Sequence, residues 1–166
     1  MSPEKVDIML RSYQECAGRC GHLEQEIAGL KSMIERLKKT ALEDAVSTTS
    51  QVTGMPRGGS TSDPTARVGI MYADGGVPKE VRELEGELKA LEAEYSEKHQ
   101  TIVFVTAWLS GLTAKERWLI EKHVIDAAYW REVVIAYHVE FGENYSRDGL
   151  KRIQQAALQK IYKMAA

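Results

Sequence analysis

The feature that most restricts the fold of this chain is a heptad spacing of apolar residues near its N-terminus. From residue 3 to about 40, apolar side chains recur at alternating steps of three and four for more than four heptads. Such a seam keeps one face of a helix apolar, and helices bury it by pairing. The sequence therefore predicts a long coiled-coil helix, with seam positions Val6, Met9, Tyr13, Cys16, Cys20, Leu23, Ile27, Leu30, Ile34 and Leu37.

A second segment, from about residue 77 to 110, continues the same spacing. Pro78 suits a first helical turn, and the glutamates that follow it suit the positive end of a helix dipole. Paired within one chain, the two seams predict an antiparallel hairpin; paired between chains, they predict a homodimer. Both remain open. The second seam consists of Val81, Leu84, Leu88, Leu91, Tyr95, Lys98, Ile102, Val105 and Leu109.

Residues from about 41 to 76 join the two segments. Their centre is rich in Gly, Pro, Ser and Thr, which predicts a flexible linker. Gly58 and Gly59 lie outside the spacing that a phosphate loop requires, so they do not predict nucleotide binding.

The C-terminal third carries the signals of three shorter helices. Thr113 and Glu116 form a capping box, which predicts a helix to about residue 124. A second helix is predicted from about residue 127 to 140, and Ser146 is a good N-cap for a third. The third helix has an apolar stripe for packing, formed by Leu150, Ile153, Ala157, Leu158 and Ile161. The fold class is therefore all-α, with a helical hairpin and its linker over residues 1–110 and a helix-turn-helix module over residues 111–166.

The polar residues of the last helix predict a DNA-binding surface. A recognition helix contacts base edges from its N-terminal end, where most of these residues lie. The helix has five cationic side chains and one anionic side chain, in a chain whose net charge is −2. The alternative is a solvated basic face. The predicted DNA-binding residues are Arg147, Asp148, Lys151, Arg152, Gln155 and Lys160.

Three stretches of the module resemble region 4 of bacterial sigma-70 factors: Leu112–Ile120, Tyr129–Val134, and Tyr145–Ile153 together with Ala157–Ile161. That pattern has a capped helix with Glu-Arg, a Glu-Ile-Ala helix, and a Ser/Thr-Arg-Glu opening to the last helix. The chain is most similar to small phage and prophage regulators of the ArpU/RinA type. Their linker signature is similar to the segments 54–59 and 62–65.

The resemblance implies a transcriptional regulator that binds promoter DNA and controls late phage genes. It places Ser146 at the helix cap and puts four residues on DNA-facing positions: Arg147, Asp148, Lys151 and Arg152. The chain departs from the pattern by a longer segment over 134–146 and by Gly149, where the family has a larger residue. It also lacks a region 2, so promoter melting by this chain alone is not expected.

Two other functions fit the same pattern. A coiled-coil interaction protein would bind RNA polymerase without touching DNA. A DNA-packaging protein similar to a small terminase subunit would join the same kinds of helix but assemble into rings of eight or more copies.

An enzyme is not predicted, because the four histidines are scattered without a nucleophile or ligand spacing around them. Cys16 and Cys20 lie four residues apart but lack the further ligands of a zinc site, so we predict no metal and no cofactor. The chain has neither a signal peptide nor an apolar run long enough for a membrane span. We therefore expect a cytoplasmic protein with reduced cysteines.

Overall fold

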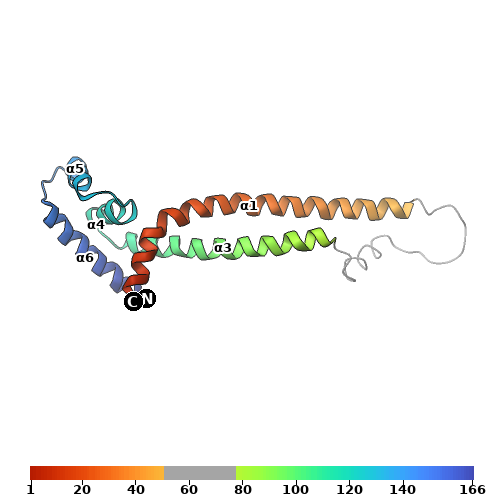
Figure 1. Ribbon diagram of the computed structural model, residues 1–166, viewed down its shortest axis with the longest axis horizontal. Coiled ribbons are helices and arrows are strands. Elements are labelled where there is room, and N and C mark those ends of the chain that lie inside the picture. The colour runs from red at the N-terminus through yellow and green to blue at the C-terminus, as the bar shows by residue number, and fades with distance from the viewer. Residues whose placement is uncertain (51–77) are drawn as a thin grey trace, which may run out of the picture. The chain divides into compact units, whose positions relative to one another are not determined.

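The structure is a computed structural model that describes residues 1–50 and 78–166, and the side chains of residues 44–50 lie outside the description. No strand occurs in the described ranges, which confirms the predicted all-α class. The elements, labelled in Figure 1 except for η1, are α1 (Pro3–Ser50), α3 (Lys79–Ser110), α4 (Ala114–Leu119), the π-helix η1 (Ile120–Ile125), α5 (Trp130–Phe141) and α6 (Arg147–Ala165).

The helix boundaries differ from the prediction in two places. Helix α1 ends at Ser50, ten residues beyond its predicted end. The remainder of the predicted linker, with the segments 54–59 and 62–65, lies outside the described residues. The predicted start of α5 at Ala127 is wrong, because this residue has a φ of 54° and cannot belong to a right-handed helix.

Contacts divide the chain into two compact units. The long-helix unit consists of Leu23–Glu94, and the terminal unit joins Met1–His22 to Tyr95–Ala166. The predicted boundary between residues 110 and 111 falls inside the terminal unit, because the ends of both long helices pack with the C-terminal helices.

In the long-helix unit, two ion pairs join α1 to α3. The distance from Nζ to Oε1 is 2.8 Å for Lys31 and Glu92, and 2.7 Å for Lys38 and Glu85. From the first pair to the second, the residue number rises by seven in α1 and falls by seven in α3. These segments therefore run antiparallel, and their contacts repeat every heptad. The hydrogen bond from Lys38 lowers the pKa of Glu85. The predicted seam positions of this unit are all buried or half-buried.

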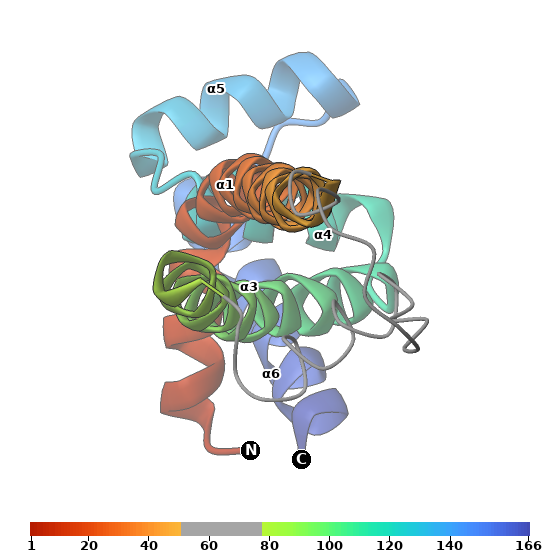
Figure 2. The same cartoon turned by 90° about the vertical axis from the view of Figure 1, so that its right-hand side faces the viewer.

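The larger core of the terminal unit lies where the first turns of α1 pack against α6. Both views show the two termini side by side, with α5 toward the opposite end of α6 (Figures 1 and 2). Leu10 and Trp108 lie off the predicted seams, yet both are buried in this core. Its buried members are Val6, Met9, Leu10, Val105, Trp108, Leu109, Leu112, Ile120, Ile125, Ala157 and Ile161.

A second core of the terminal unit joins α4, α5 and α6. It consists of Leu119, Val133, Tyr137 and Leu150, and Tyr137 packs edge-on against the ring of Trp118 at a centroid distance of 5.6 Å. Leu150 in this core, with Ala157 and Ile161 in the larger one, is fully buried. The predicted apolar stripe of α6 is therefore confirmed, and it faces both cores.

A partly buried hydrogen bond joins α6 to the start of α1. Tyr162 Oη donates to Asp7 Oδ1 at 2.8 Å. Burial, with a smaller contribution from Asp7, raises the pKa of Tyr162 to about 12.

This raised pKa predicts a loss of stability in strong base. The unfolded chain releases the Tyr162 proton near pH 10 and the folded chain near pH 12, so the folded state should lose stability between these values. Below pH 10 the contribution is complete. Urea unfolding followed across this range should show the loss in the wild type and a weaker loss in Tyr162→Phe. Equal slopes in both proteins would contradict the assignment.

Candidate nucleic-acid interface

The segment between α5 and α6 has a defined geometry at both ends. Helix α5 is followed by Gly142, whose φ of 68° suits glycine, and whose N–H donates to the His138 carbonyl at 2.8 Å. Ser146 Oγ accepts from the Gly149 N–H at 3.2 Å, which confirms the predicted N-cap. Lys115 of α4 contacts Glu143 at 2.6 Å and thereby ties the segment to α4.

One face of α6 is polar and exposed along most of its length. At 3.6 residues per turn, its members follow one another at steps of three and four. We call them the outer stripe: Asp148, Arg152, Gln155, Gln159 and Lys163. This stripe lies opposite the buried Leu150, Ala157 and Ile161. In the part of the chain that is described, Arg152, Gln155 and Gln159 take part in no hydrogen bond or ion pair, so their polar groups face solvent.

The predicted site residues divide between this stripe and its flanks. Asp148, Arg152 and Gln155 lie on the outer stripe, and Arg147 precedes it as an exposed first-turn residue. Lys151 is half-buried on one flank, with Nζ 5.9 Å from the centroid of the Trp130 ring. Gln159 was missed by sequence reasoning, although it continues the spacing from Arg152 and Gln155.

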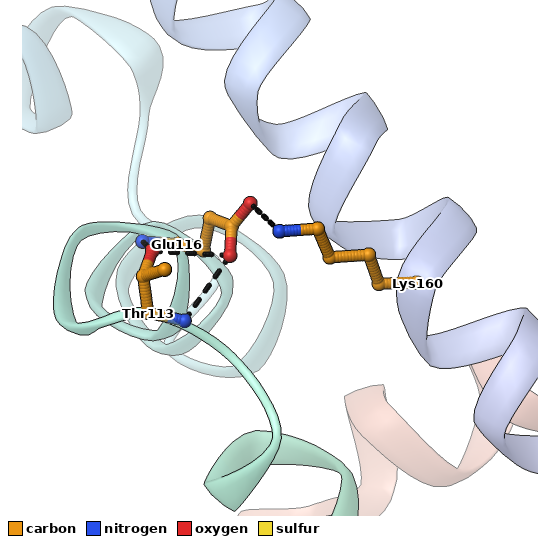
Figure 3. Close-up of polar contacts among 3 residues, drawn as sticks. All are labelled: Thr113, Glu116 and Lys160. Atoms are coloured by element: carbon orange, nitrogen blue, oxygen red, sulfur yellow. Dashed lines mark hydrogen bonds and ion pairs between the residues drawn. The ribbon is translucent and has the colours of Figure 1, made fainter.

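Lys160 lies on the opposite flank and contacts α4 (Figure 3). Its Nζ donates to Glu116 Oε1 at 2.6 Å. The second oxygen of Glu116 accepts from Thr113 N–H at 3.1 Å and from Thr113 Oγ1 at 3.0 Å, which completes the predicted capping box. The hydrogen bond from Lys160 is the main cause that lowers the pKa of Glu116, with Thr113 adding to it. Lys160 therefore has a packing role in this structure.

Gly149 lies outside the outer stripe, so its missing side chain removes no contact from that stripe. A Cβ atom at this position would lie 3.2 Å from Tyr145 Cδ1, so the position faces the preceding segment and not the open side of α6. A larger residue would press on Tyr145, which itself packs edge-on against Tyr137 at a centroid distance of 5.7 Å.

The described residues contain no group of three or more His, Cys, Asp or Glu side chains arranged to hold a metal ion. Cys16 and Cys20 are buried, as expected for apolar seam positions, and neither forms a disulfide within the described residues. None of the helices within 1–50 and 78–166 combines the length and apolar composition that a membrane crossing needs.

No protein-family model, curated protein or solved structure matches this chain.

Proposed function

We propose that this chain is a sequence-specific, double-stranded DNA-binding regulator. In this proposal α5 and α6 form a helix-turn-helix of the sigma region 4 type, and α6 enters the major groove. The paired α1 and α3 form a coiled-coil hairpin. The resemblance to ArpU/RinA-type regulators extends the proposal to phage or prophage promoters and their late genes.

The observation that carries the proposal is the outer stripe of α6. Arg152, Gln155 and Gln159 are exposed on one helix face without competing partners among the described residues. Arginine can bind guanine and glutamine can bind adenine with two hydrogen bonds each in the major groove. The opposite face of α6 is fixed by two cores, so the stripe is presented on a rigid element.

The proposal predicts that Arg152→Ala combined with Gln155→Ala strongly weakens DNA binding. Each lost base contact should cost about 1–3 kcal/mol, so affinity for the preferred duplex should fall at least tenfold. The preferred duplex would first be selected from a pool of random DNA sequences with the wild type. Fluorescence anisotropy would then measure the affinity of both proteins for this duplex. The double variant should also lose discrimination between this duplex and unrelated DNA.

A matched control is available in the long-helix unit. Arg36→Ala combined with Gln25→Ala removes the same residue types from exposed positions on α1. This control should bind as the wild type does. Equal affinities of the wild type and the Arg152/Gln155 variant would contradict the assigned face. If the wild type binds no DNA at low salt, the interaction-protein alternative is favoured. The exposed Ile135 and Val139 of α5 then become the surface to test against RNA polymerase.

A further inference from the structure

The terminal unit contains a cleft of about 500 Å³ beside the N-terminal end of α5. Four helical elements contribute to its polar and aromatic lining: Arg11 comes from α1, His123 from η1, Trp130 from α5 and Gln154 from α6. The remaining wall is mainly apolar and includes residues 124, 125, 127 and 128. All of these residues belong to the same compact unit.

The backbone that forms one wall of the cleft has an irregular conformation. η1 is a π-helix, and Ala127 after it has a φ of 54°. His123 Nδ1 lies 2.9 Å from the Ala128 carbonyl oxygen, and because a carbonyl only accepts, Nδ1 must carry the hydrogen. The His123 ring stands against Trp130 at a centroid distance of 4.0 Å. The two rings thus form a preorganised surface.

The charges around the cleft favour an anion. Arg11 is exposed and has no hydrogen bond or ion pair among the residues that the structure describes. No described carboxylate lines the cleft: Asp126 contacts Lys122 at 3.0 Å and Gln14 at 2.6 Å, Asp7 accepts from Tyr162, and Glu15, one turn along α1 from Arg11, lies outside the lining. The guanidinium and the Gln154 amide therefore offer N–H donors for which an oxyanion is the matching acceptor.

The cleft lies on the Lys151 side of α6. Neighbouring helix residues are about 100° apart, so the half-buried Gln154 lies between this flank and the buried face of α6. Lys151, between Gln154 and the outer stripe, lies beside Trp130. When a helix lies in a major groove, its flanks face the sugar-phosphate backbones that border the groove. The strand that borders the groove on the Lys151 side would be the one nearer to the cleft.

We propose that this cleft binds a phosphate group of the DNA backbone, with Arg11 as the principal donor. The inference rests on the proposed function and adds to it a DNA contact in α1, outside the predicted module of residues 111–166. Phosphate contacts of this kind fix the orientation of a protein on DNA and add to affinity without reading sequence.

Arg11→Gln tests the proposal in the full chain. Binding should weaken about fivefold to tenfold on preferred and unrelated duplexes alike. The slope of log affinity against log KCl concentration should fall by about one, because one phosphate contact is lost. Arg11→Lys should recover part of both effects. Lys5→Gln is the matched control, because it removes one exposed charge from the same helix at a position that does not line the cleft. Thermal unfolding of Arg11→Gln should match that of the wild type, since Arg11 is exposed and unpaired.

Equal weakening of DNA binding by Arg11→Gln and Lys5→Gln would show that the effect comes from the lost net charge alone, and this result would overturn the proposal. Unchanged affinity and slope in Arg11→Gln would also overturn it, while a loss of binding in the Arg152/Gln155 variant would leave the proposed function intact. Replacing KCl with potassium phosphate at equal ionic strength distinguishes a free phosphate from the DNA backbone. If the cleft contacts the DNA backbone, free phosphate competes with it, so the wild type should lose more DNA affinity than Arg11→Gln does. Equal losses in the two proteins, together with a thermal stabilisation of the DNA-free wild type by phosphate that Arg11→Gln lacks, would assign the cleft to a free phosphate and reject the DNA contact.

Discussion

Leu10→Ala is expected to lower the free energy of unfolding of the terminal unit by about 3 kcal/mol, within the range for fully buried leucines. Leu10 has no exposed surface and packs in the core that includes Val105, Ala157 and Ile161. The substitution leaves a cavity where the start of α1 meets α6. Urea unfolding followed by tryptophan fluorescence measures the effect, because Trp108 belongs to the same core.

The matched control for this prediction is two residues away. Ile8 lies on the same helix, but 66% of its surface is exposed, so Ile8→Ala should change stability by less than about 0.5 kcal/mol. A small effect of Leu10→Ala would mean that the first turns of α1 are not part of the folded terminal unit. The C-terminal helices would then form a module by themselves, as the predicted boundary at residues 110 and 111 assumed.

The heptad spacing predicted the packing face of the long helices well, because pairing with one neighbour requires only one apolar stripe. It missed Leu10 and Trp108 because these residues face additional neighbours in the terminal unit. A residue beside a seam position, as Leu10 is beside Met9, indicates a wider apolar face, but it does not identify the second neighbour. The discontinuous unit thus depends on contacts between distant segments, which local spacing does not encode.

The candidate interface was predictable to a similar degree. The N-cap at Ser146 and the capping box could be predicted from the local sequence, because a cap depends on residues within one helical turn. The exposure of Arg152 and Gln155 followed from the position of the apolar stripe. Charge alone did not distinguish Lys160 from the others, because its partner Glu116 lies 44 residues away in sequence. The cleft at Arg11 could not be predicted from local sequence patterns either, because its lining comes from four separate elements.

Glu116→Ala is expected to destabilise the terminal unit by about 2 kcal/mol. It removes the reciprocal half of a capping box and the partner of Lys160. The Glu116 side chain is only 11% exposed, but that of Lys160 is 51% exposed, so solvent screening limits the contribution of the pair. A double-mutant cycle with Lys160→Ala should give a coupling energy of about 1 kcal/mol.

The pH dependence provides an independent check on the same pair. The pKa of Glu116 is lowered from 4.5 on folding, so its contribution to stability is complete above pH 4.5 and is lost as pH falls through the folded value. The stability difference between the wild type and Glu116→Ala should therefore be largest near neutral pH and shrink in acid. The exposed pair of Lys39 and Glu43, at 3.8 Å, is the control and should show a coupling energy below about 0.5 kcal/mol. Equal coupling energies in the two pairs would show that Lys160 is not held by Glu116, and Lys160 would then be free to contact DNA phosphate.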